Sequence, residues 1–136
     1  MRPGETRRRR QGGFTLVELI VVCAVIGILS AVAVGNYQRS IKKAKEAALT
    51  QNLYTMRTLI NQYFADKGKY PQDLQALVDD HYIQAIPRDP ITDSAETWVT
   101  IPSEMTEEDI ASDPGIAGVK SGAEGTALDG RAFSDF

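Results

Sequence analysis

The feature that most limits how this chain of 136 residues can fold is an apolar run with a single charge, residues 14–34 (FTLVELIVVCAVIGILSAVAV). A helix rises 1.5 Å per residue, so the run would be about 30 Å long, which matches the hydrocarbon core of a bilayer. Four consecutive arginines, residues 7–10, precede it. Positive charge on this side keeps the N-terminus cytoplasmic and places the residues after the run on the exported side. The sequence therefore predicts one membrane-spanning helix and, after it, an exported domain.

The charges of the chain are distributed unevenly. Residues 1–13 contain five arginines and one glutamate, a net charge of +4, so the overall charge of −3 leaves −7 for residues 14–136. A chain this acidic after its first 13 residues is a poor candidate for binding nucleic acid. The only cysteine, Cys23, and the only histidine, His81, have no catalytic or metal-binding spacing. We see no phosphate-binding loop or nucleophile motif, so we expect a protein that is not an enzyme.

The one charge in the apolar run, Glu18, and the residues around Cys23 bear on how this segment is processed. An unpaired acid in a membrane helix costs about 3 kcal/mol on insertion scales. A removable secretory signal cut after Ala33 gains nothing from such an acid. Lipoprotein processing at Cys23 is disfavoured by the bulky residues Val21 and Val22 before it. A plain signal anchor stays open on composition alone.

The block formed by residues 12–18, GGFTLVE, comes shortly after the arginines and opens the apolar run. It resembles the class III signal of type IV pilins and type II secretion pseudopilins. The resemblance implies that residues 1–13 are a basic leader and that a membrane prepilin peptidase cuts between Gly13 and Phe14. It also implies that the same machinery methylates the new amine of Phe14.

Glu18 would then be the fifth residue of the mature chain. The family resemblance implies that Glu18 of one subunit meets the Phe14 amine of its neighbour and sets the axial register of a filament. A cation and an anion brought together in a low-dielectric core offset each other's desolvation, whereas either alone would be costly. We therefore expect Glu18 to be an assembly residue.

A long helix is predicted to continue beyond the membrane, because the sequence contains no proline between Pro3 and Pro71. We expect it over residues 14 to about 66, with 14–35 in the membrane or filament core and the exported globular domain spanning 36–136. Gly35 predicts a soft point or partial unwinding. Gly68 is suited to the C-cap. Apolar residues recur at mostly helical spacing and predict the face that packs on the domain: Tyr37, Ile41, Ala44, Ala48, Met56, Ile60 and Phe64, with Leu49, Leu53, Leu59 and Tyr63 beside them.

The globular part reads as a small α+β domain. Residues 69–78 predict a turn and a short helix with Pro71 in its first turn. Residues 97–101 predict a strand, residues 116–119 a second, and residues 102–114 an exposed loop. The fold class we expect is α+β and pilin-like: a long N-terminal helix packed on a small antiparallel sheet with extended loops. Together with residues 86–90 (IPRDP), the stretch 69–78 resembles the major pseudopilins of type II secretion, the protein G family.

The segment 121–130 (SGAEGTALDG) and Ser134-Asp135 are rich in oxygen donors and glycines, which suits Ca²⁺. The stretch also resembles the calcium loop of secretion pseudopilins, although glutamate stands where the family has aspartate. Candidate carboxylate ligands are Glu124, Asp129 and Asp135. Glycine-rich acidic segments are also commonly loops without a ligand, and both interpretations remain open.

The resemblance implies a subunit of a homo-oligomeric helical filament, the type II secretion pseudopilus. Its implied partners are the prepilin peptidase and methyltransferase, an inner-membrane platform protein, a cytoplasmic assembly ATPase and minor pseudopilins. The chain would start in a bacterial inner membrane with its C-terminal domain periplasmic, and then enter a periplasmic filament. Alternatives are a type IV pilus subunit for adhesion, motility or DNA uptake, and a signal-anchored periplasmic binding module.

Overall fold

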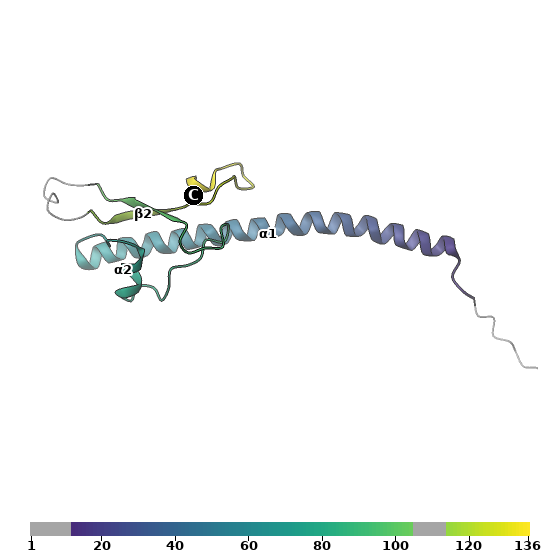
Figure 1. The fold of residues 1–136 in the computed structure, drawn as a ribbon, viewed down its shortest axis with the longest axis horizontal. Helices are drawn as coiled ribbons and strands as arrows, with labels where there is room; N and C mark the ends of the chain where they lie inside the picture. The colour runs from purple at the N-terminus through teal and green to yellow at the C-terminus, as the bar shows by residue number, and fades with distance from the viewer. Residues whose placement is uncertain (1–11, 105–113) are drawn as a thin grey trace, which may run out of the picture. The chain divides into compact units, whose positions relative to one another are not determined.

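The computed structural model describes residues 12–104 and 114–136. Its elements, in chain order, are α1 (Leu16–Lys67), α2 (Leu74–Asp79), β1 (Trp98–Pro102), β2 (Ile116–Ser121) and the short 3₁₀ helix η2 (Phe133–Asp135) (Figure 1). The chain forms two compact units, Met1–Arg39 and Ser40–Phe136, and α1 contributes to both. The predicted α+β class is confirmed. Most of the predicted loop 102–114 lies outside the described residues.

Helix α1 is continuous over its 52 residues. The partial unwinding expected at Gly35 is absent, since α1 stays helical through that residue. Glycine keeps its backbone N–H, unlike proline, and its cost of about 1 kcal/mol is too small to break a long helix. The C-cap prediction is confirmed: Gly68 has a φ of 70° and donates its N–H to the carbonyl oxygen of Phe64 at 2.8 Å.

The buried face of α1 differs in part from the predicted face. Its buried residues alternate in steps of four and three and so form one stripe: Leu49, Leu53, Met56, Ile60 and Tyr63. Four residues that were predicted to lie on this face are exposed: Tyr37, Ala44, Ala48 and Phe64. The stripe that is buried carries larger apolar side chains than the alanine positions, so its burial removes more apolar surface from water.

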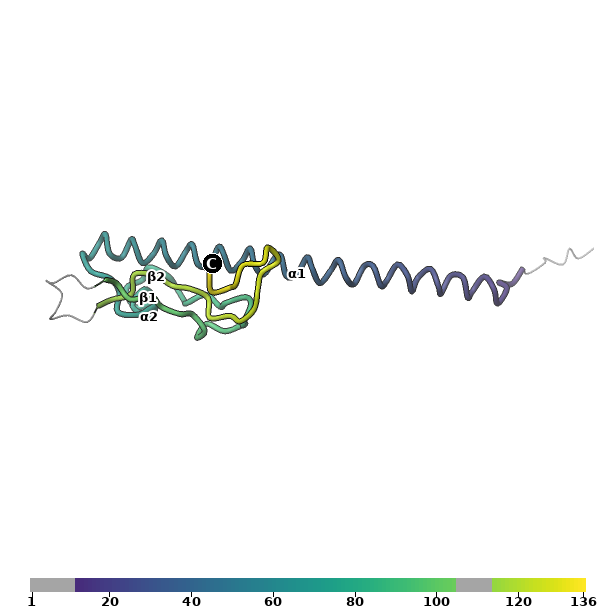
Figure 2. Tube along the Cα trace, turned by 90° about the horizontal axis from the view of Figure 1, so that it is seen from above, coloured from purple at the N-terminus to yellow at the C-terminus, as the bar shows by residue number. Residues whose placement is uncertain are grey.

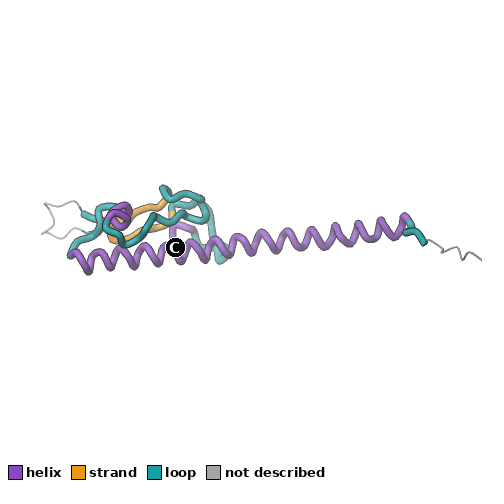
Figure 3. Tube along the Cα trace, turned by 90° about the horizontal axis from the view of Figure 1, so that it is seen from below, coloured by secondary structure: helices purple, strands orange, loops and turns teal. Residues whose placement is uncertain are grey.

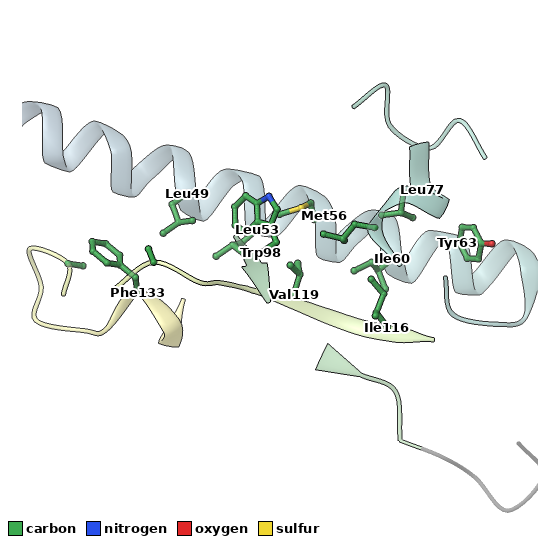
Figure 4. Packing of buried hydrophobic residues seen from close by; sticks show 13 residues of the cluster. Leu49, Leu53, Met56, Ile60, Tyr63, Leu77, Trp98, Ile116, Val119 and Phe133 are labelled. Atoms are coloured by element: carbon green, nitrogen blue, oxygen red, sulfur yellow. The ribbon is translucent and has the colours of Figure 1, made fainter. Parts of the chain in front are cut away.

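The two strands form an antiparallel pair in which Trp98 faces Ser121 and Thr100 faces Val119. Figures 1 and 2 show both strands running alongside the part of α1 that belongs to the second unit. Trp98 and Val119 point toward Leu53 and Met56 of α1, as the close view shows (Figure 4). Loops account for much of the remaining chain around this small sheet (Figure 3). The hydrophobic core therefore lies between α1 and the strands.

Helix α2 starts at Leu74, and Pro71 lies before it, so the placement of Pro71 in the first helical turn was wrong. The N-cap is Asp73, whose carboxylate accepts a hydrogen bond from the N–H of Ala76 at 2.8 Å. Pro71 is instead fully buried, and its carbonyl oxygen accepts from the N–H of Ile116 at 2.8 Å. Pro71 thus connects the turn after α1 to the beginning of β2.

Candidate processing and assembly site

The predicted cleavage bond, Gly13–Phe14, lies in exposed backbone that is not part of a helix. The Phe14 side chain is 90% exposed, and α1 begins two residues later at Leu16. Peptidases act on accessible backbone outside regular structure. The local structure around Gly13 and Phe14 thus meets this requirement.

Thr15 and Glu18 form a capping box at the start of α1. The Glu18 carboxylate accepts from the backbone N–H of Thr15 at 2.9 Å and from its hydroxyl at 3.2 Å. In return, the Thr15 hydroxyl oxygen accepts from the N–H of Glu18 at 3.2 Å. The T-x-x-E pattern is a known sequence signature of this arrangement, although we did not predict the capping box from the sequence.

The capping box lowers the expected free-energy cost of placing the Glu18 carboxylate in an apolar environment. A carboxylate in the first turn of a helix is stabilised by the N–H groups there and by the positive end of the helix dipole. Part of the desolvation cost of Glu18 is therefore already offset within its own helix. Thr15 and Glu18 also come after the predicted bond Gly13–Phe14, so removal of residues 1–13 would leave the capping box intact.

The first part of α1 presents an uncovered apolar surface. Every described residue from Gly12 to Ser40 is exposed. Within the described part of the chain, α1 is the one helix long and apolar enough to cross a membrane. Contiguous apolar surfaces of this size are rare on soluble monomers. Residues 16–34 of α1 are therefore suited to contact with lipid or with other apolar helices.

Of the three candidate calcium ligands, Asp129 has an ion-pair partner. Asp129 is held by Arg131: its Oδ2 lies 2.8 Å from Nε of Arg131, and its Oδ1 accepts from the Arg131 backbone N–H at 3.0 Å. That N–H, and after it the guanidinium group, lowers the pKa of the Asp129 carboxyl below its ordinary value. Glu124 and Asp135 are exposed.

Over residues 12–104 and 114–136, no three histidine, cysteine, aspartate or glutamate side chains gather in a group able to hold a metal. The structure thus does not bring Glu124, Asp129 and Asp135 together as a three-carboxylate site. Calcium binding stays a prediction.

Known proteins similar to this chain are pilins and pseudopilins. Residues 8–34 match the family described as the prokaryotic N-terminal methylation motif. The fimbrial protein EcpC of Eikenella corrodens is 30% identical over 125 residues, which cover 88% of this chain and 78% of the relative. Type II secretion system core protein G of Aeromonas hydrophila is 32% identical over 100 residues, which cover 62% of this chain and 70% of the relative.

A third relative, the type IV major pilin protein PilA of Myxococcus xanthus, is 38% identical over 61 residues, covering 45% of this chain and 28% of the relative. No solved structure matches the chain. EcpC and the core protein G are both aligned over more than two thirds of their length at 30% identity or more. This chain belongs to the pilin-like family that contains type IV pilins and type II secretion core protein G.

Proposed function

We propose that this chain is a structural subunit of a type II secretion pseudopilus. The chain would then consist of a cleaved leader at 1–13, a membrane and filament-core segment at 14–35 and an exported domain at 36–136. The observation that carries it is the order of features along residues 12–18: an exposed, non-helical Gly13–Phe14 bond comes directly before the Thr15–Glu18 capping box that begins an exposed apolar helix.

The physical steps of assembly depend on that order. The membrane holds the first part of α1, with its N-terminus cytoplasmic, until the prepilin peptidase cuts before Phe14 and the new amine is methylated. A filament then replaces lipid around α1 with the α1 helices of other subunits. Glu18, already oriented by Thr15, meets the Phe14 amine of its neighbour in that low-dielectric core. The chain performs no chemistry itself and depends on the platform protein, the assembly ATPase and minor pseudopilins.

Mass spectrometry of the N-terminus of membrane-extracted protein tests this proposal. We expect a chain that begins with N-methylated Phe14. A Gly13→Val variant, in which a branched side chain stands at the scissile bond, should retain residues 1–13. A wild-type chain that keeps its leader, or one that starts after Ala33, would contradict the proposed processing.

A type IV pilus subunit is the second candidate, because relatives named as a fimbrial protein and a type IV major pilin also match. A deletion strain separates the two functions. Secreted proteins retained in the periplasm would support the pseudopilus. Surface filaments at native expression that vanish on deletion, with secretion unchanged, would support the pilus.

A further inference from the structure

The segment 122–136 returns to α1 after β2 and is attached there by charged side chains of the helix. Nζ of Lys42 donates to the carbonyl oxygen of Thr126 at 3.0 Å. One helical turn further on, the Glu46 carboxylate accepts from the N–H of Leu128 at 2.8 Å. A cation and an anion of α1 therefore hold a backbone acceptor and a backbone donor located two residues apart in the segment.

A second attachment involves two arginines. Arg57 of α1 donates through Nε and Nη2 to the carbonyl oxygen of Val119 at 3.1 and 2.9 Å, and through Nη2 to the backbone oxygen of Phe136 at 2.5 Å. The guanidinium of Arg131 lies 4.3 Å from the centre of the Phe136 ring and also binds Asp129. Arg131 thus links the turn at 129 to the last described residue of the segment.

Three backbone oxygens around the turn at 125–131 already have N–H partners. The carbonyl oxygen of Gly125 accepts from Phe133 at 3.2 Å, and that of Arg131 accepts from Ala127 at 2.8 Å. The carbonyl oxygen of Ala127 accepts from Gly130 at 3.1 Å. Calcium requires six to eight oxygen ligands, commonly carboxylates and backbone carbonyls. Here nitrogen donors already bind these three carbonyl oxygens.

The positive charges near Asp129 and Thr126 also disfavour a bound divalent cation. A divalent cation at Asp129 would have to displace the Arg131 guanidinium from that carboxylate. Arg131 binds that carboxylate at 2.8 Å, and the carbonyl oxygen of Thr126 likewise already accepts from the ammonium group of Lys42. Like charges repel, and the loss of the charge-assisted hydrogen bond between Arg131 and Asp129 adds to the cost.

We propose that segment 122–136 is a metal-independent clasp in which Arg131, Lys42 and Arg57 supply the positive charge that Ca²⁺ would supply in a calcium-binding loop. The carboxylate of Asp129 and the carbonyl oxygen of Thr126 do not fit a calcium ion while Arg131 and Lys42 bind them. This inference concerns the fold of the second unit and holds whether the protein works in a pseudopilus or in a pilus.

Metal titration of the full chain in detergent tests the clasp. Calcium at millimolar concentration saturates even weak extracellular protein sites. We expect the midpoint of thermal unfolding to be the same with millimolar CaCl₂ as with EGTA, and we expect no heat of binding in calorimetry. A midpoint that rises with CaCl₂, or binding heat with a defined stoichiometry, would overturn the proposal.

Variants of Arg131 give an independent readout. Arg131→Gln should lower the midpoint by about 2 to 5 °C in EGTA and expose segment 122–136 to proteolysis. Arg131→Lys should recover part of the loss because it retains the charge. The matched control is Arg88→Gln, since Arg88 is 72% exposed and forms a loose pair with Asp93 at 3.6 Å. Equal midpoints and equal proteolysis for the two glutamine variants would overturn the role of Arg131. If Arg131→Gln does not fold, the calcium titration of the wild-type chain still decides whether segment 122–136 binds the metal.

Discussion

At the scale of single residues, Asp89 is the charged side chain most completely buried in the described chain, with 0% exposure. Its Oδ2 accepts from the hydroxyl of Ser121 at 2.5 Å, and its Oδ1 accepts from the N–H of Ile91 at 2.8 Å. The Ser121 hydroxyl oxygen in turn accepts from the N–H of Ala123 at 3.1 Å. Asp89 therefore joins the turn after it to the end of β2.

Replacement of Asp89 by alanine should destabilise the second unit. It would leave the Ser121 hydroxyl and the Ile91 N–H without their acceptor, and each unsatisfied buried group costs about 1 to 3 kcal/mol. We expect the free energy of unfolding, measured with urea on the full chain in detergent, to fall by about 2 to 4 kcal/mol. The control is Asp66→Ala, which removes an exposed acceptor of the Tyr82 hydroxyl. Similar losses in both variants would contradict the importance of burial at Asp89.

At the scale of elements, the end of α1 is tied to the residues just after α2. Nζ of Lys67 lies 2.5 Å from Oδ2 of Asp80 and 4.7 Å from the centre of the Tyr63 ring. The hydroxyl of Tyr82 donates to Asp66 at 2.8 Å. The hydrogen bond from Lys67 is the main cause that lowers the pKa of the Asp80 carboxyl, and the same bond raises the pKa of Lys67. These contacts hold the end of α1 against the α2 region.

This pair predicts an acid-dependent contribution to stability. Because the pKa of Asp80 is lower in the folded chain than in the unfolded chain, the contribution is present above the ordinary carboxyl pKa and is lost as pH falls through the folded value. Asp80→Asn should therefore lower the unfolding midpoint at pH 7, and its difference from wild type should vanish as pH falls below the folded pKa of Asp80. Thermal melts across this pH range test it, with Asp79→Asn as the neighbouring control. A constant difference between wild type and Asp80→Asn at every pH would refute the ion-pair explanation.

At the scale of the whole molecule, the two units differ in how their apolar residues are covered. The second unit has its own core, built from α1, α2 and the strands. In the first unit all described side chains are exposed, including the apolar residues of α1. An exposed apolar helix requires another phase or another chain to cover it, so a membrane and a filament of identical subunits are both suited to it.

Substitution of Glu18 separates helix capping from intersubunit charge pairing. Glu18→Gln retains a side chain that can serve in a capping box but removes the charge, whereas Glu18→Ala removes both. We expect both variants to be cleaved at Phe14 and to give at least a roughly tenfold reduction in sheared filaments, because a neutral side chain cannot pair with the neighbouring amine. Filaments of normal yield from Glu18→Gln would show that only capping matters. Normal yield from both variants would remove Glu18 from assembly.

The sequence predicted those features that depend on neighbours along the chain. The absence of proline between Pro3 and Pro71 predicted the long helix, Gly68 its C-cap, and residues 97–101 the first strand within one residue of β1. The Thr15–Glu18 box belongs to the same class, since its residues are three apart, and it could have been found from T-x-x-E.

Only the tertiary structure decided which partners meet across the chain. Asp89 bonds Ser121 across 32 positions and Glu46 bonds the Leu128 N–H across 82, and no local pattern encodes either contact. Leu49 is buried and Ala48 exposed, because Leu49 packs in the cluster that contains Phe133, a residue far away along the chain. The physical reason is that helices, caps and membrane spans arise from interactions within about four residues or with the solvent phase, which the sequence records directly. Contacts between distant segments depend instead on which surfaces pack best once those elements exist, and that is a property of the whole folded unit.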